Sequence, residues 1–118
     1  MKDNKLNFNH LIIDGLECDN DKLKDEERIS ELLNTLPEKI EMKKLSSPMV
    51  FKGSDHLPGL TGVVIIETSH IAFHTFTDEN KVNIDIYSCK DFDNEMVLEE
   101  FKKTFGIKKM IVKGCRRV

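Results

Sequence analysis

Three apolar runs follow one another closely in the middle of the chain, and they constrain its fold more than any other feature. The runs are Val63–Ile66, Ile71–Phe76 and Val82–Tyr87. Short segments rich in Val, Ile and Phe, separated by polar residues, are typical of neighbouring β-strands. Residues Thr77–Asn80 have the composition of a turn between the second and third runs. We therefore expect three consecutive strands at the centre of one sheet.

Two segments have the apolar spacing of helices that pack one face against a sheet. The first is Asp21–Thr35, which Pro37 is expected to end, with apolar residues at Leu23, Ile29, Leu32, Leu33 and Leu36. The second is Glu95–Phe105, which Asn94 would cap and Gly106 would end. Its apolar face would consist of Met96, Val97, Phe101 and Phe105.

Three further segments predict strands outside the central group: His10–Leu16, Lys39–Leu45 and Met110–Val112. Residues 52–62 contain several Gly and Pro residues and predict a loop. Since helices are few and most strands are adjacent in sequence, we expect an α+β fold. It would be a two-layer α/β sandwich with a mainly antiparallel sheet and two helices on one face.

The run Val63–Ile66 is apolar at consecutive positions, which is typical of a strand that is buried on both sides. Helices would cover only one face of the sheet. The other face is therefore expected to pack against a second copy of the chain, as a homodimer.

Composition narrows the classes of function. The chain has 118 residues, enough for a single domain over 1–118. Its net charge of -3 argues against a nucleic-acid partner. No signal peptide and no apolar run of about 18 residues is present, so we expect a cytoplasmic protein without a membrane partner. The cysteines, Cys18, Cys89 and Cys115, are odd in number and lack CxxC spacing, which argues against a disulfide framework and a zinc site.

Polar side chains between the central runs are candidates for chemistry. Ser69 and His70 are adjacent, so on a strand they point to opposite faces, and His70 is a poor base for Ser69. His74 could reach Ser69 only if the chain bends between them. Cys89 follows the third run. Each residue taken singly has a common structural explanation, as a packed serine, a satisfied histidine or a small buried thiol.

Taken together, these residues resemble a known family. TGVVIIETSHIAFHTFTDE, followed by VNIDIYSC, resembles the bacterial and archaeal S-adenosylmethionine decarboxylase proenzymes, whose motif runs SGVVxISESHxxIHTWPE before a strand that ends in D-x-x-x-C. HLIIDGLEC near the N-terminus resembles the opening of that family. The resemblance covers nearly the whole chain.

The resemblance implies an enzyme that makes its own cofactor. The hydroxyl of Ser69 would attack the carbonyl of Thr68, and the chain would be cut between these residues to leave a pyruvoyl group derived from Ser69. His74 and Thr61 match residues that assist this processing. The pyruvoyl group would form a Schiff base with the substrate amine, and Cys89 would donate the proton after loss of CO2. No metal would be needed.

Four departures from the family motif concern the cleavage site and the substrate. Thr68 replaces Glu before the processed serine, and the loop over residues 58–61 is one residue shorter. His56 stands where the family has an aromatic residue thought to stack on adenine. Asp78 replaces a Glu associated with the ribose. Asp14 matches an acidic position that could line the pocket, although an exposed carboxylate is an equally good interpretation.

Three functions therefore remain open. The first is S-adenosylmethionine decarboxylation in spermidine biosynthesis. The second is decarboxylation of a basic amino acid, arginine or ornithine, because the departures gather on substrate recognition. The third is an unprocessed homologue without catalysis. In the family, the homodimer of processed protomers completes the active site with groups from both subunits.

Overall fold

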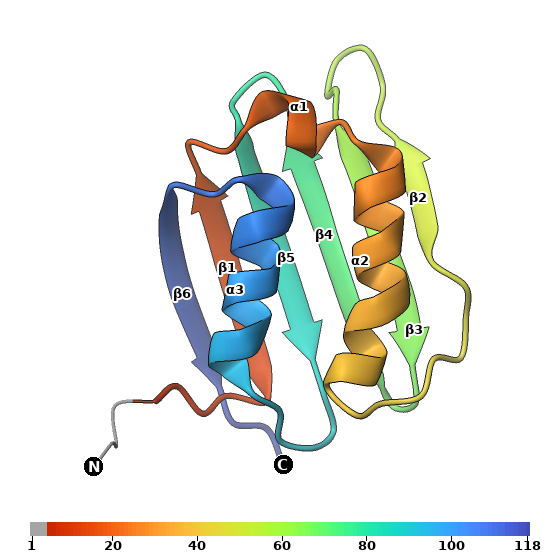
Figure 1. Cartoon of the computed structure of the whole chain (residues 1–118), viewed down its shortest axis with the longest axis vertical. Helices are drawn as coiled ribbons and strands as arrows, with labels where there is room; N and C mark the ends of the chain where they lie inside the picture. The colour runs from red at the N-terminus through yellow and green to blue at the C-terminus, as the bar shows by residue number, and fades with distance from the viewer. Residues whose placement is uncertain (1–4) are drawn as a thin grey trace.

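The computed structural model describes residues 5–118 and consists of one antiparallel sheet with helices on one side (Figure 1). The sheet has six strands in the order β2-β3-β4-β5-β1-β6. Every neighbouring pair is antiparallel. The strands are β1 (His10–Leu16), β2 (Met49–Lys52), β3 (Leu60–Ile66), β4 (Ser69–Phe76), β5 (Lys81–Tyr87) and β6 (Lys109–Cys115).

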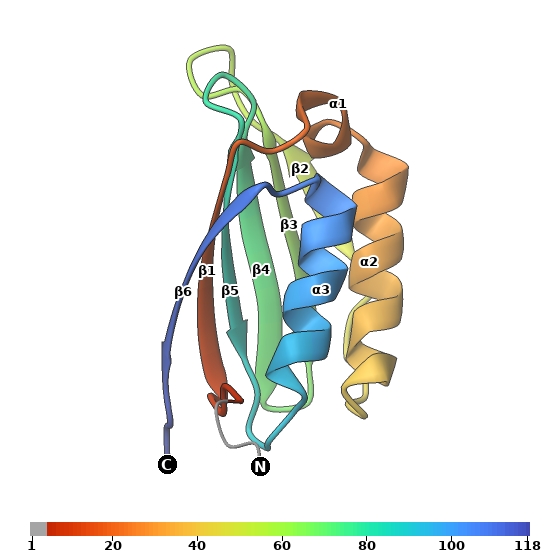
Figure 2. The same cartoon turned by 60° about the vertical axis from the view of Figure 1, so that its left-hand side comes forward.

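The long helices α2 (Glu26–Lys39) and α3 (Asn94–Phe105) lie side by side on one face of this sheet, with the short α1 (Asn20–Leu23) above them (Figures 1 and 2). Figure 2 shows that no segment within residues 5–118 covers the opposite face. The predicted α+β sandwich, with a mainly antiparallel sheet and two helices on one face, is therefore confirmed. Within residues 5–118, no helix is both long and apolar enough to cross a membrane.

The core lies between the sheet and the two long helices. The ring of Phe73 on β4 makes edge contacts with Phe101 and Phe105 of α3, at centroid distances of 6.3 and 5.1 Å. Gly62 of β3 faces the same layer, where an added Cβ would collide with the Phe73 ring and crowd Leu33 of α2. Since fully burying such a side chain contributes about 1.5–3 kcal/mol, this layer fixes which face of the sheet the helices cover.

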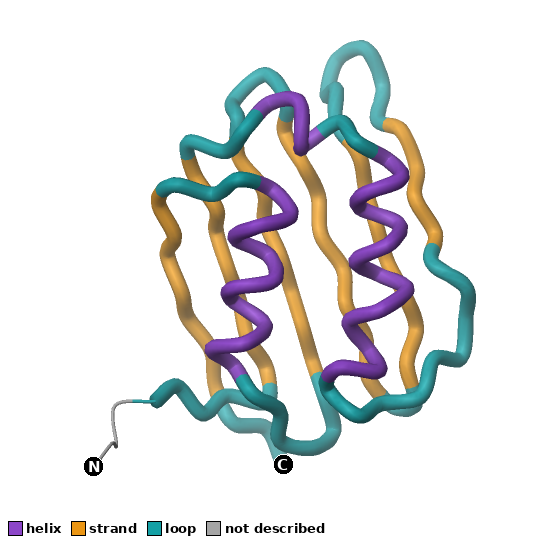
Figure 3. Tube along the Cα trace, viewed as in Figure 1, coloured by secondary structure: helices purple, strands orange, loops and turns teal. Residues whose placement is uncertain are grey.

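The helical segment predicted at Asp21–Thr35 is two helices, and Figure 3 shows the break between them. Asp25 causes the break because its side chain accepts a hydrogen bond from the Arg28 amide and starts α2 anew. Pro37 does not end α2, which continues to Lys39. Pro37 has no N–H of its own to donate. The amide of Ile40, which follows the proline, donates to the Leu36 carbonyl, and this bond closes the last turn.

Asn94 is not the cap of α3, as the sequence suggested. The preceding residue, Asp93, is the N-cap, and its side chain accepts the Met96 amide. Gly106 does end the helix, in the left-handed conformation that the prediction required.

The strand predicted at Lys39–Leu45 is wrong, because Lys39 still belongs to α2 and Glu41 turns the chain with a φ of 59°. Ile40 is buried under the helix end, so its apolar character serves that end and not a strand. Only Lys44 makes a bridge, to Ile66. The second strand is β2, whose pairing with β3 begins β3 at Leu60, earlier than predicted.

The uncovered face of the sheet, called the open face below, carries every second residue of each strand. Val64 and Ile66 of β3 point into the core, whereas Ile65 lies on the open face and is 40% exposed. Ile12 of β1 and Ile111 of β6 share this face and are 37% and 41% exposed. The predicted burial of Val63–Ile66 on both sides thus requires a partner that the single chain does not supply.

Candidate active site

Ser69 is the first residue of β4 and follows a two-residue loop, Glu67-Thr68, that joins β3 to β4. The strand alternation puts the Ser69 side chain on the helix-covered side, where it is only 7% exposed. The Cys89 amide donates a hydrogen bond of 2.9 Å to Ser69 Oγ. The serine hydroxyl is therefore held in place at the tip of a hairpin, directly beside the peptide bond that precedes it.

Cys89 lies two residues beyond the end of β5, and its exposed thiol reaches the same loop. Its Sγ lies 4.0 Å from the carbonyl oxygen of Glu67. The neighbouring hydroxyl groups of Thr68 and Ser69 lower the pKa of the Cys89 thiol from its ordinary value of 9.0. Burial instead raises the pKa of Cys18 to about 11. The structure thus brings Thr68, Ser69 and Cys89 together and distinguishes Cys89 from the buried thiol.

The pKa of Cys89 gives a testable result at this site. Two variants would be compared. Both carry Ser69→Ala, which keeps the peptide bond before residue 69 intact, and one of them also carries Thr68→Val. Loss of the Thr68 hydroxyl removes the largest cause of the lowered pKa, so the Cys89 pKa rises and less thiolate is present near pH 8. Alkylation of Cys89 by iodoacetamide, followed by peptide mass against pH, should be slower with Thr68→Val. The exposed Cys115 is the internal control, and an unchanged profile at Cys89 would contradict this account.

Thr61 and His74 form a second polar pair. They are cross-strand partners on β3 and β4, and Thr61 Oγ1 lies 2.8 Å from His74 Nδ1. The pairing of β4 with both neighbours is continuous, so the strand has no bend. His74 is five positions along from Ser69, which is roughly 16 Å on a strand, and it points to the open face. Within one chain, His74 therefore does not reach Ser69.

The residues expected to bind substrate lie at the His74 end of the sheet. His56 is exposed in the loop between β2 and β3, and Asp78 is exposed in the turn between β4 and β5. A cavity of about 280 Å³ opens there, lined by Leu57, Thr61 and His74 among others, although not by His56. Gly59 lets this loop lie against β4, since a side chain at its φ of 149° would collide with the Thr75 carbonyl.

Asp14 lies on the open face of β1, where it accepts a hydrogen bond of 2.7 Å from the Asn83 side-chain amide. Asn83 is in turn the cross-strand partner of both Asp14 and His74. Asp14 therefore belongs to the same transverse row as the Thr61–His74 pair. Asp14 is half-buried and hydrogen-bonded, so it is not the exposed carboxylate that was the alternative interpretation of the sequence.

A third group of polar residues on the open face was missed in the sequence. Asp85 of β5 accepts hydrogen bonds from two histidines, at 2.8 Å from His10 Nε2 and 2.7 Å from His70 Nε2. Partial burial tends to raise the pKa of Asp85, but the hydrogen bonds from His70 and His10 outweigh it and lower that pKa. The Tyr87 ring lies 5.8 and 6.1 Å from the two imidazoles.

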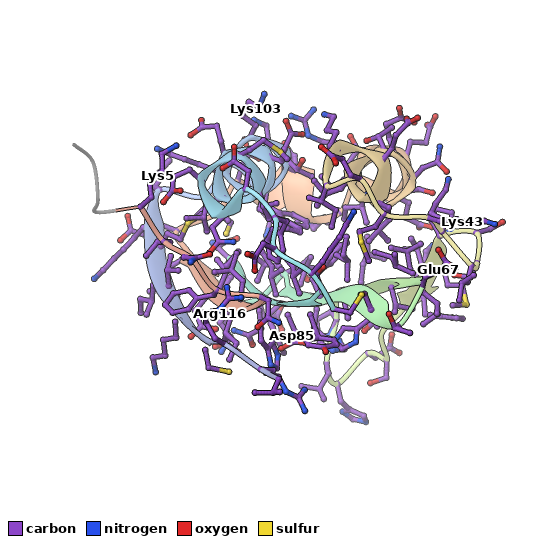
Figure 4. The ribbon with its side chains drawn as sticks, turned by 90° about the horizontal axis from the view of Figure 1, so that it is seen from below. Lys5, Lys43, Glu67, Asp85, Lys103 and Arg116 are labelled. Carbon is purple, nitrogen blue, oxygen red and sulfur yellow. The ribbon has the colours of Figure 1, made fainter. Side chains whose placement is uncertain are left out.

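Figure 4, viewed from the Ser69 end of the sheet, shows the helices on one side and Asp85 on the other. The cluster of His10, Asp85 and His70 therefore lies at the same end as Ser69 and Cys89, although on the open face. Strand alternation alone would have put His70 and Asp85 on one face. Their common contact with His10 required the pairing of β1 with β5, which no local pattern indicates.

The chain is similar in sequence to proteins of known function. The model of the S-adenosylmethionine decarboxylase family matches residues 9–118. The S-adenosylmethionine decarboxylase proenzyme of Clostridium botulinum (strain Langeland) is 32% identical over 109 residues, which cover 92% of this chain and 91% of that protein. The proenzyme of Archaeoglobus fulgidus is 30% identical over 99 residues, covering 79% of this chain and 85% of the relative.

The fold is likewise similar to a solved structure. The crystal structure of the adenosylmethionine decarboxylase from Aquifex aeolicus superimposes with a TM-score of 0.74 at 25% identity. The match covers 97% of this chain and 93% of that one. Similarity to the Clostridium botulinum relative and to the solved structure therefore extends over more than nine tenths of the chain.

Proposed function

Because the chain belongs to the S-adenosylmethionine decarboxylase family, whose members are carboxy-lyases of polyamine biosynthesis, we propose that it decarboxylates S-adenosylmethionine with a pyruvoyl group made from its own Ser69. The domain, residues 1–118, would be cut between Thr68 and Ser69. The observation that carries this proposal is the position of Ser69, with its hydroxyl held at a hairpin tip beside the peptide bond it would attack.

The processing chemistry uses groups that the chain supplies. Ser69 Oγ bonds to the Thr68 carbonyl carbon, the C–N bond of that peptide breaks, and an ester remains. Loss of the Ser69 α-proton then expels Oγ as part of the Thr68 carboxylate and leaves dehydroalanine. Water replaces the nitrogen, which departs as ammonia, and the ketone is formed. The Cys89 amide, which donates to Ser69 Oγ, is placed to stabilise the negative charge that this oxygen acquires.

A pyruvoyl ketone supplies an acceptor for the electrons that are released when CO2 leaves the substrate. The surroundings of Ser69 fit such a group, since its side chain is enclosed, already meets a backbone donor, and is adjacent to a thiol. In this arrangement Cys89 holds the proton that the product receives. A thiol that is exposed on one side and borders Ser69 on the other can deliver that proton as substrate departs.

The processing assistants Thr61 and His74 lie at the other end of the sheet, so we propose that a second copy of the chain supplies them. Two sheets stacked through their open faces, about a twofold axis that lies in the interface and crosses the strands, would put the Ser69 end of each against the His74 end of its partner. Each of the two sites in the dimer would then use Ser69 and Cys89 from one protomer and Thr61 and His74 from the other.

The chemistry of the open face supports this homodimer of processed protomers. Its exposed apolar side chains, Ile12, Ile65 and Ile111, would leave water. Three groups of its polar side chains are already paired within the chain: Asp85 with His10 and His70, Asp14 with Asn83, and Thr61 with His74. Burial of paired groups costs far less than burial of unpaired ones, so these three groups can be covered at a low cost in free energy.

The proposed substrate site follows from the same pairing. The cavity beside His74, and the loop that carries His56, would adjoin the partner's Ser69 end. Its size suits a small molecule. Asp78 keeps a carboxylate near this site for a hydroxylated or cationic group of the substrate. The relatives are named S-adenosylmethionine decarboxylases, which favours this substrate over arginine or ornithine and over a homologue without catalysis.

The experiment that tests the proposed function has two readouts. The intact mass of the purified protein should show two chains, residues 1–68 and a second chain that starts at a pyruvoyl-blocked position 69 and reacts with a carbonyl reagent. Release of labelled CO2 should then occur from carboxyl-labelled S-adenosylmethionine and not from arginine or ornithine. One stable uncut chain of 13.6 kDa would reject the pyruvoyl proposal. Cleavage with activity only on a basic amino acid would reject the substrate.

A further inference from the structure

Thr68, the residue on the amino side of the proposed cut, has a left-handed backbone with a φ of 49°. This region is rarely occupied by residues other than glycine, and for a β-branched side chain it is a true outlier. The other described non-glycine residues with positive φ are Glu17, Glu41 and Asn80, none of which is β-branched. The least tolerant of the four side chains thus stands at the scissile bond.

The hairpin that contains Thr68 is also of an unfavourable kind. Ile66 pairs with Ser69, so Glu67 and Thr68 form a two-residue loop. Such loops favour a type I′ turn, with positive φ at both residues, or a type II′ turn, with positive φ at the first. Here only the second residue has positive φ. The loop therefore matches neither type, and its twist opposes that of the strands it joins.

Contacts on both sides hold the loop in this conformation. The Glu67 amide donates to the Lys43 carbonyl at 3.0 Å, and Figure 4 shows these two residues close together at the edge of the molecule. On the other side the Cys89 amide donates to Ser69 Oγ. The Thr68 hydroxyl donates to the Glu67 carbonyl at 2.7 Å. Strained conformations persist only where the surrounding structure fixes them in this way, and they gather at functional sites.

The geometry points to Thr68 as a strained residue that drives its own cleavage, an inference that rests on the processing proposed above. When Ser69 Oγ bonds to the Thr68 carbonyl carbon, the bond that breaks is the C–N bond that closes the hairpin. The hydroxyl proton passes to the freed amine of Ser69. An ester is ordinarily less stable than a peptide, so the shift runs uphill in a relaxed chain. When the hairpin opens, the backbone of Thr68 can leave its left-handed conformation, and the strain energy that is released offsets part of that cost.

Two substitutions at position 68 separate backbone strain from the threonine hydroxyl. Thr68→Gly accepts a positive φ without strain, whereas Thr68→Val keeps the branched side chain and lacks the hydroxyl. Freshly translated precursor would be followed by gel as it cuts. We expect Thr68→Gly to cut about tenfold more slowly, equivalent to ~1.4 kcal/mol of released strain, and Thr68→Val to keep at least the natural rate. Glu41→Gly, which relieves a φ of 59° away from the site, should leave the rate unchanged.

A second measurement distinguishes strain from a structural defect. In chains that also carry Ser69→Ala and so stay uncut, Thr68→Gly should raise the midpoint of urea unfolding. Slower cutting together with greater stability is the signature of strain, since a merely structural role for Thr68 would lower stability.

The outcomes separate this inference from the proposed function. If the natural chain is never cut, the processing proposal fails. If the natural chain is cut and Thr68→Gly cuts as fast or faster, only the strain inference is overturned. It is equally overturned if Thr68→Val slows cleavage as much as Thr68→Gly, because the hydroxyl would then be the cause. A lower midpoint of urea unfolding for Thr68→Gly in the uncut chain would also overturn it.

Discussion

Ser69→Ala is expected to give a single uncut chain and to abolish decarboxylation. Alanine has no oxygen to attack the Thr68 carbonyl, so neither the ester nor the ketone can form. Since enzymes of this kind accelerate their reactions by at least about a millionfold, loss of the electrophile should reduce CO2 release to the level of a blank. Intact mass and labelled-CO2 release measure the two losses on one preparation.

Ser88→Ala is the matched control for this result. Ser88 is another buried serine, directly after the end of β5 and adjacent to Cys89, and its hydroxyl donates to the Lys90 carbonyl. Its hydroxyl also accepts the Lys90 amide, so its loss costs about 1 kcal/mol of stability for each of these two hydrogen bonds, and the chain should still be cut. Cleavage of the Ser69→Ala chain between residues 68 and 69 would show that another group starts the reaction and would remove Ser69 from its assigned role.

His74→Ala is expected to slow cleavage at least about a hundredfold by itself, which is the usual contribution of a positioned acid or base, and to be rescued by a partner. The partner is the Ser69→Ala chain, which cannot be cut but keeps His74. When the two are produced together, the His74→Ala chain should be cut, because its Ser69 would meet the histidine of the other protomer. A mass tag on one chain identifies which of them is cleaved.

The control for this rescue is a partner that carries both Ser69→Ala and His74→Ala. It has the same open face but no histidine to offer, so it should restore nothing. If the His74→Ala chain is cut equally well with either partner, or alone at the natural rate, His74 does not act across the dimer. Rescue by the first partner alone would in turn establish that the two ends of the sheet meet between protomers.

The strands that carry the site could be predicted because their burial alternates within a few residues. The pattern of β4 and β5 placed Ser69 and Cys89 correctly near one another, since cross-strand pairing is set by a short turn. β2 was missed because its four residues form a partly exposed edge strand with little alternation. The break at Asp25 was missed because the apolar spacing continues across it and only the local capping hydrogen bond interrupts the helix.

The candidate site was harder to predict than the strands. A separation of five residues puts Ser69 and His74 on opposite faces of an unbent strand, so the role of His74 depended on a bend, and only the continuous pairing of β4 shows that there is none. The hydrogen bonds of Asp85 to His10 and His70 join residues from three strands. Such contacts depend on sheet order, which the sequence does not state. The positive φ of Thr68 depends on how the hairpin is held from outside.

The order of the strands has a consequence for the cut protein. Residues 1–68 contain β1, β2 and β3, and residues 69–118 contain β4, β5 and β6. In the sheet, however, β4 lies beside β3, and β1 lies between β5 and β6, so three of the five neighbouring pairs join one product to the other. After the cut that we propose, the protein would thus be a pair of interlaced fragments. Before the cut, folding is unimolecular. After it, a denatured protein would have to bring two separate chains together, so recovery would depend on concentration and maturation would have to follow folding.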